Sequence, residues 1–104
     1  MASAFIYVGA AMRIPTCIRI IGLGYQIEWV KGLLANEGDR GNVSYNDAKI
    51  RIDPDIPFDR QQRTFLHETI HAIDETLKIG LKHDQVAQLA AGLTDVLRQI
   101  EEET

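Results

Sequence analysis

Cysteine is nearly absent from this sequence. Cys17 is the only one among 104 residues, so no disulfide can form within the chain. A chain without disulfides is compatible with a reducing compartment such as the cytoplasm. We expect Cys17 to be a buried structural thiol rather than a nucleophile.

Basic residues are also in short supply. The chain has 11 Lys and Arg against 15 Asp and Glu, which gives a formal net charge of -4 and a sequence pI near 5.2. A protein that binds nucleic acid needs a basic face for the phosphates. The apolar N-terminal stretch is too short to span a bilayer and has no charge before Arg13, unlike a secretory signal. We therefore expect a cytoplasmic protein with no nucleic-acid or membrane partner.

The rest of the composition is that of an ordinary globular domain. Apolar residues make up 45% of the chain and charged residues 25%, and the length suits one modest core. We expect residues 15–104 to form a single domain. Residues 1–14 are expected to be a poorly ordered leader or a short extra strand.

The first half of the chain predicts β-strands. Residues 17–21 and 25–30 alternate between apolar and polar side chains, with a glycine-rich break between them. Residues 43–45 and 49–53 flank a turn sequence at 46–48, which is typical of a β-hairpin.

The second half predicts two amphipathic helices. The first lies between Asp59, the expected N-cap, and a stop at Gly80, with Gln62 completing a variant of the capping box. The second runs over roughly 84–101, and its small residues at 90–92 allow close packing against the first. The predicted fold is α+β, a small antiparallel or mixed sheet packed against these two helices.

The first helix carries the pattern His67-Glu68-x-x-His71. Residues four apart on a helix lie about 40° apart, so both imidazoles can bind one tetrahedral zinc ion at roughly 2.0–2.1 Å. Glu68, about 100° further round, flanks the metal and can act as a general base. Asp74, one turn beyond His71, can hydrogen-bond to a ligand imidazole or pair with a nearby cation. The pattern predicts a zinc site that requires a third protein ligand.

Four segments of the chain together resemble a known protein family. They are Gly41-x-Val43-x-Tyr45, Lys49-Ile50-Arg51-Ile52, Thr64-x-Leu66-His67-Glu68-x-x-His71-Ala72-Ile73-Asp74 and Val86-x-x-Leu89-Ala90-x-Gly92-Leu93. Over about residues 16–100 the chain resembles the small phage- and prophage-encoded zinc peptidase-like proteins, which are related to the ImmA/IrrE metallopeptidase group and are minimal gluzincins. The resemblance implies zinc as the cofactor, His67 and His71 as ligands, and Glu68 as the catalytic base.

The third ligand is where the sequence departs from that family. The resemblance implies a glutamate at the start of the following helix, but this chain has His83 and Asp84 there. Asp84 is the chemically closest substitute and is the predicted ligand, unless it serves only as a helix N-cap. His83 is the alternative, and it would complete a three-histidine site, which zinc also accepts.

The motif and the resemblance predict a zinc-dependent metallopeptidase in a bacterial host cell. Its substrate would be a peptide or protein such as a regulatory protein, added as a strand to the edge of the sheet. Tyr45, or His83 if it is not a ligand, can donate a hydrogen bond to the oxyanion. The alternative is a catalytically inactive protein that keeps the fold for binding or regulation. The two differ at Glu68, which only the peptidase requires.

Overall fold

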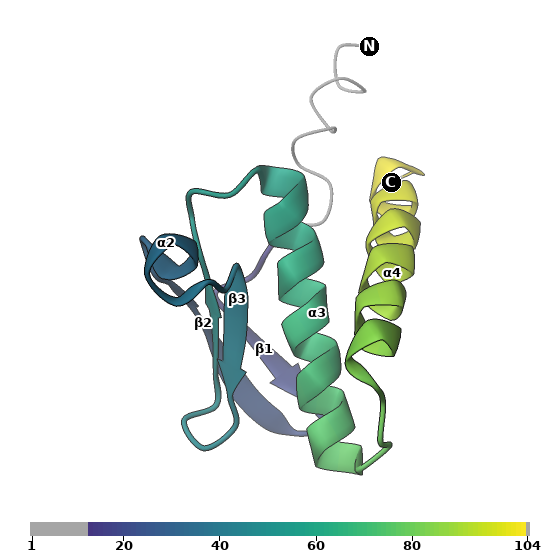
Figure 1. Cartoon of the computed structure of the whole chain (residues 1–104). Helices are drawn as coiled ribbons and strands as arrows, with labels where there is room; N and C mark the ends of the chain where they lie inside the picture. The colour runs from purple at the N-terminus through teal and green to yellow at the C-terminus, as the bar shows by residue number, and fades with distance from the viewer. Residues whose placement is uncertain (1–12, 104) are drawn as a thin grey trace.

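The computed structural model describes residues 13–103 (Figure 1). Most of the predicted leader, residues 1–12, lies outside the described residues. Seven elements follow one another along the described chain: β1 (Cys17–Ile20), β2 (Leu23–Trp29), α2 (Leu33–Glu37), β3 (Gly41–Ser44), β4 (Lys49–Ile52), α3 (Phe58–Leu77) and α4 (His83–Glu103).

The four strands form one mixed sheet in the order β1-β2-β4-β3. β1 pairs antiparallel with β2, and β3 with β4, whereas β2 and β4 are parallel. The parallel pair is possible because the connection through α2 and β3 is long enough to return the chain to the same end of the sheet. The predicted hairpin is confirmed as β3 and β4, with Val43 opposite Ile50.

The apolar core lies between the sheet and α3. Ile50 and Ile52 are completely buried on the central strand β4, as their alternation with Lys49 and Arg51 predicts. Burying a side chain of this size contributes about 1.5–3 kcal/mol. The buried cluster consists of Ile20, Tyr25, Ile50, Ile52, Ile56, Phe65, Leu66, Ile70, Ala72, Val86 and Ala90. The α+β fold class is therefore confirmed, with α3 held firmly against the sheet.

The predicted capping box of α3 is wrong. The helix begins two residues earlier than expected, its N-cap is Pro57, and no side chain caps it. Asp59 instead lies within the first turn, where its charge is favourable to the helix dipole. Gln62 is buried and accepts a hydrogen bond from Nε of Arg98 on α4, at 2.6 Å. The side chain predicted to cap α3 thus joins α3 to α4.

α4 packs against α3 and leaves a large part of its apolar surface exposed. Figure 1 shows α3 lying between α4 and the sheet. Val86, Ala90 and Thr94 are buried in this arrangement. Four side chains on an adjacent face of α4, which we call the α4 stripe, remain about half exposed: Leu89 (46%), Leu93 (43%), Val96 (48%) and Ile100 (54%).

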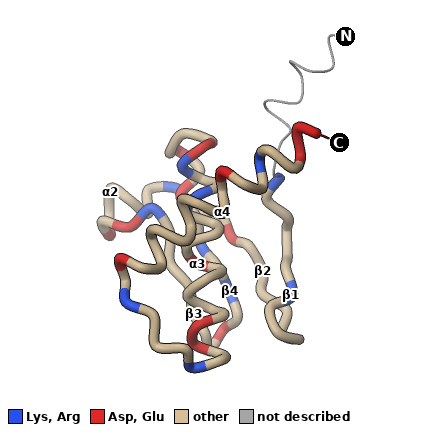
Figure 2. Tube along the Cα trace, turned by 90° about the vertical axis from the view of Figure 1, so that its right-hand side faces the viewer, with Lys and Arg blue, Asp and Glu red and all other residues tan. Residues whose placement is uncertain are grey.

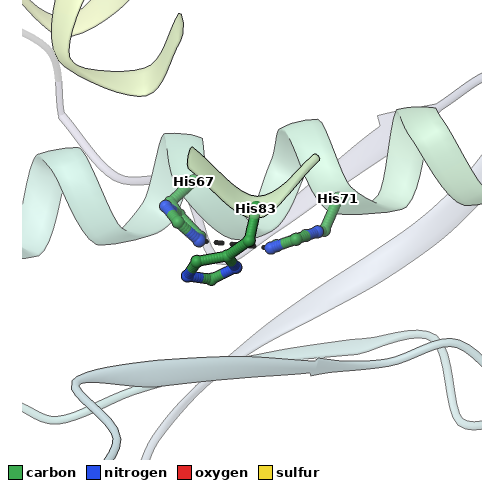
Figure 3. A group of neighbouring side chains, drawn as sticks. All are labelled: His67, His71 and His83. Carbon is green, nitrogen blue, oxygen red and sulfur yellow. Dashed lines mark hydrogen bonds between the residues drawn. The ribbon is translucent and has the colours of Figure 1, made fainter. Parts of the chain in front are cut away.

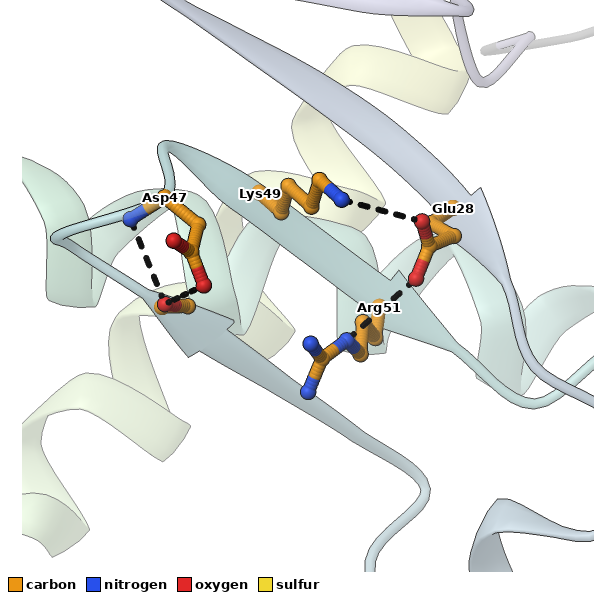
Figure 4. Close-up of polar contacts among 5 residues, drawn as sticks. Glu28, Asp47, Lys49 and Arg51 are labelled. Atoms are coloured by element: carbon orange, nitrogen blue, oxygen red, sulfur yellow. Dashed lines mark hydrogen bonds and ion pairs between the residues drawn. The ribbon is translucent and has the colours of Figure 1, made fainter.

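The outer face of the sheet carries ion pairs between neighbouring strands. Glu28 of β2 lies 3.5 Å from Nζ of Lys49 and 3.4 Å from Nε of Arg51, both on β4 (Figure 4). Ser44 and Asp47 hydrogen-bond to each other across the hairpin turn. Exposed pairs of this kind contribute at most about 1 kcal/mol each. The two pairs of Glu28 join the parallel strands β2 and β4.

The remaining surface is charged and mixed. Figure 2 shows acidic and basic positions interspersed along the chain, with an acidic end to α4. The prediction of a buried thiol is wrong, because Cys17 is exposed on β1. The alternation along β1 turns Ile18 and Ile20 inward and therefore turns Cys17 outward. Within residues 13–103, no helix has both the length and the apolar character needed to cross a membrane.

Candidate metal centre

Three histidine side chains converge beside α3 (Figure 3). His67 and His71 lie one turn apart on α3, and His83 is the first residue of α4. One potential ligand nitrogen from each lies within 4.8 Å of the other two. The ring centroids are 4.8, 5.1 and 5.6 Å apart. Two helices therefore bring together three imidazoles, which are the ligand type most common at zinc sites.

The two histidines on α3 fit a tetrahedral metal ion. Their Nε2 atoms are 3.2 Å apart. Two nitrogens bound to zinc at roughly 2.0–2.1 Å with a tetrahedral angle would be about 3.3–3.4 Å apart. The separation of the two Nε2 atoms is therefore within about 0.2 Å of the value that such a site requires. His83 is the exposed member of the group, so its ring can adjust at low cost.

The surroundings of His67 and His71 favour the neutral, metal-binding form of both imidazoles. Partial burial, followed by the neighbouring charges of His71 and His83, lowers the pKa of His67 from 6.5 to about 4. Burial and His83 also lower the pKa of His71, while Asp74 acts in the opposite direction. Because a metal ligand must be deprotonated, these imidazoles are ready to bind metal at neutral pH.

His83, the third histidine of the group, is the residue predicted from the sequence as the alternative third ligand. His83 belongs to the cluster, and Asp84, the preferred candidate, does not. Consecutive helical residues point about 100° apart, so adjacent positions cannot both face the same metal. Asp84 is exposed in the first turn of α4, where a carboxylate is favourable to the helix dipole.

Asp74 stabilises the segment between α3 and α4, which positions His83 next to the other two histidines. Its Oδ1 accepts hydrogen bonds from the backbone N–H groups of Gly80, at 2.8 Å, and Leu81, at 3.1 Å. Lys78 and Gly80 both have positive φ, so the chain turns sharply after α3 and leads back into α4. Asp74 thus holds the backbone before His83, and among the described residues its carboxylate forms no hydrogen bond with a ligand imidazole and no ion pair.

Glu68 faces a cavity of ≈ 400 Å³ beside the histidines. His67 and His83 line the same cavity. Burial, and then the charge of Asp39, raises the pKa of Glu68 to about 7. Its side chain is only 8% exposed, and the carboxylate forms no hydrogen bond within the described part of the chain. This value applies to the metal-free site, and the position of the carboxylate beside the histidines is what allows it to act as a general base and then as an acid.

The edge strand β3 approaches α3 closely at this cavity. A Cβ atom at Gly41 would collide with Cγ2 of Thr64 and would lie 2.7 Å from the carbonyl oxygen of Arg51. It would also lie 3.7 Å from Cγ of Glu68. Glycine is therefore required where the backbone of β3 passes the motif helix. Because β3 ends the sheet, its outer edge has no strand partner within residues 13–103.

Several cavity residues were not identified from the sequence. Arg60 and Arg63 lie seven and four residues before His67, on nearly the same face of the helix. This spacing could have predicted that both side chains lie near the histidines. Asp39 and Arg40 come from the loop before β3. No local pattern indicates their position, because it depends on how β3 packs against α3.

Comparison with known proteins gives no family assignment. No protein-family model matches the chain, and no curated protein or solved structure matches it significantly. The resemblance to the ImmA/IrrE metallopeptidase group therefore stays a prediction.

Proposed function

We propose that this protein is a zinc-dependent metallopeptidase whose metal is held by His67, His71 and His83. The observation that supports this most strongly is the convergence of three imidazoles, two of which, His67 and His83, line the cavity that the buried carboxylate of Glu68 faces. Structural zinc sites normally have four protein ligands, whereas catalytic sites have three and an open position. Three histidines next to a cavity match the catalytic arrangement.

In this proposal Glu68 moves the protons of the reaction. Bound zinc would polarise the scissile carbonyl and lower the pKa of a water molecule at its open position. Glu68 accepts a proton from the attacking water and later gives it to the leaving amine. Its place next to His67, facing the cavity, puts the carboxylate beside both the ligands and the substrate.

We keep Tyr45 as the candidate donor to the oxyanion, although it lies outside the residues that line the cavity. It follows β3, and its phenol pKa is raised by burial and then by the charges of Glu75 and Glu68. The phenol therefore stays protonated at neutral pH and can donate a hydrogen bond to the developing negative charge. His83 cannot have this role if it is a metal ligand.

The substrate we propose is an extended peptide or a protein segment. The open edge of β3 passes Glu68, so a peptide that pairs with this edge would cross the cavity at the catalytic carboxylate. A phage- or prophage-encoded protein that acts on a regulatory protein in the bacterial cytoplasm, as the sequence suggests, is part of this proposal.

The proposal is tested with a mixed peptide library and zinc-loaded protein, with products detected by mass spectrometry. Wild type is expected to cleave, and Glu68→Gln is expected to lose cleavage while it still binds zinc. The matched control is Glu75→Gln, which changes an exposed carboxylate on the same helix and should keep activity. Equal cleavage by wild type and Glu68→Gln would show that Glu68 is not the base.

A second candidate function is a binding or regulatory protein that uses the same fold without turnover. The α4 stripe supports it, because contiguous exposed apolar side chains often mark interaction sites. The two candidates differ at Glu68 and at the stripe. A binding protein should tolerate Glu68→Gln and lose function in Leu93→Gln, whereas a peptidase should show the opposite pattern.

A further inference from the structure

Three arginine side chains gather at the cavity that holds Glu68. Arg40 precedes β3, and Arg60 and Arg63 lie in the first two turns of α3. All three residues are exposed, and none of the three side chains forms an ion pair or hydrogen bond with another residue of the described chain. In contrast, Arg51 and Arg98 are each held by another side chain. The three cavity guanidinium groups are therefore free to bind a ligand.

The charge of this cavity is opposite to that of the whole chain. The protein has a formal net charge of -4, but the cavity has three guanidinium groups against two carboxylates, Asp39 and Glu68. Guanidinium groups stay charged at any physiological pH and bind carboxylates through paired N–H···O bonds. An anionic group entering from solvent is thus attracted here.

The position of the arginines relative to the metal-binding histidines indicates which part of a substrate they reach. With a rise of 1.5 Å per residue, Arg63 lies about 6 Å and Arg60 about 10 Å along α3 from His67. Neighbouring residues of an extended peptide are spaced roughly 3.3–3.4 Å apart. The distances therefore match a side chain about two to three residues away from the bond that is cleaved.

We propose that Arg60 and Arg63, assisted by Arg40, form a subsite for an acidic side chain of the substrate. The substrate class would be peptides with Asp or Glu within three residues of the scissile bond. This inference rests on the proposed peptidase function, which it makes more specific. The carboxylate at the C-terminus of a peptide has the same chemistry, and the experiment below separates these two sources.

The first experiment measures binding and does not need turnover. Two hydroxamates that chelate zinc are compared by calorimetry on zinc-loaded protein; one carries a carboxylate about 6–10 Å from the chelating group, and the other a carboxamide in its place. Wild type should bind the carboxylate compound about five- to thirtyfold more tightly than the carboxamide compound, the gain expected from two exposed ion pairs. Arg60→Gln/Arg63→Gln should lose this preference.

Two further variants serve as controls. Arg60→Lys/Arg63→Lys keeps the charge and should keep part of the preference. Arg19→Gln removes an exposed arginine on β1, outside the cavity, and should keep all of it. Thermal melts should show all variants folded, because each changed side chain is exposed.

The second experiment separates the two sources of the carboxylate. Wild type digests two peptide libraries of the same sequences, one with amidated and one with free C-termini, and the cleaved positions are read by mass spectrometry. Enrichment of Asp or Glu within three residues of the cleaved bond, lost in Arg60→Gln/Arg63→Gln, is the expected result. Cleavage restricted to peptides with a free C-terminus would overturn the side-chain assignment.

The inference and the proposed function fail in different ways. If wild type binds no zinc, both are overturned. Zinc binding without any preference of wild type for the carboxylate hydroxamate overturns the acidic subsite alone. A preference that persists in Arg60→Gln/Arg63→Gln has the same consequence.

Discussion

Glu68→Gln should stabilise the metal-free protein at alkaline pH while it removes catalysis. The folded protein holds the pKa of Glu68 at about 7, above the ordinary value of 4.5. In the unfolded chain the carboxyl therefore ionises first as pH rises. The neutral carboxyl contributes fully to the free energy of unfolding below pH 4.5, and this contribution is lost as pH rises through 7. Glutamine has the same shape and no charge, so it avoids this loss.

The size of the effect follows from the same pKa. A change from 4.5 to about 7 corresponds to about 3 kcal/mol, at 1.36 kcal/mol per pH unit. Two factors reduce this value: the carboxylate opens onto a cavity that admits water, and the amide of glutamine needs hydrogen-bond partners of its own. We therefore expect Glu68→Gln to raise the free energy of unfolding by about 1–2 kcal/mol at pH 8. At pH 5 the gain should be less than half as large.

The assay is urea denaturation with a chelator at pH 5 and pH 8. Wild type and Glu68→Gln are compared, with Glu75→Gln as the control at an exposed position of the same helix. The control should change the free energy of unfolding by less than about 0.5 kcal/mol at either pH. A Glu68→Gln protein that is equally stable with wild type at both pH values would refute the reasoning that burial raises this pKa.

Two further substitutions test how the site is built. Gly41→Ala should lower the free energy of unfolding by about 1–3 kcal/mol, because the new Cβ meets Thr64 and the Arg51 carbonyl. The control Gly92→Ala, where a Cβ has nothing within 4 Å, should raise the free energy of unfolding by about 0.5–1 kcal/mol. Similar shifts in the urea midpoint for the two variants would contradict the close approach of β3 to α3. Asp74→Ala should weaken zinc binding about 10- to 100-fold in a chelator competition, because the connection before His83 loses its anchor; unchanged affinity would show that Asp74 has no role in placing His83.

Local patterns in the sequence accounted for much of the fold. The hairpin of β3 and β4 and both long helices follow from periodicity within each segment. What the sequence did not indicate depends on contacts between distant segments. Gln62 binds Arg98 instead of capping α3, and the parallel pairing of β2 with β4 depends on where the chain returns after α2.

The same division applies to the site. His67, Glu68 and His71 lie on one helix, so their relative positions follow from helical geometry. The third ligand was ambiguous because His83 and Asp84 are adjacent, and a rotation of about 100° decides which one faces α3. That rotation is set by the turn that Asp74 holds, which no local pattern predicts.

The most direct test of the central claim is the metal content of untagged protein, measured by elemental analysis. We predict about one zinc ion per chain in wild type and in Asp84→Ala, and loss of zinc in His71→Ala and in His83→Ala. Absence of zinc from wild type, even after zinc is added, would contradict the metallopeptidase proposal. Zinc retained in His83→Ala but lost in Asp84→Ala would contradict the three-histidine site.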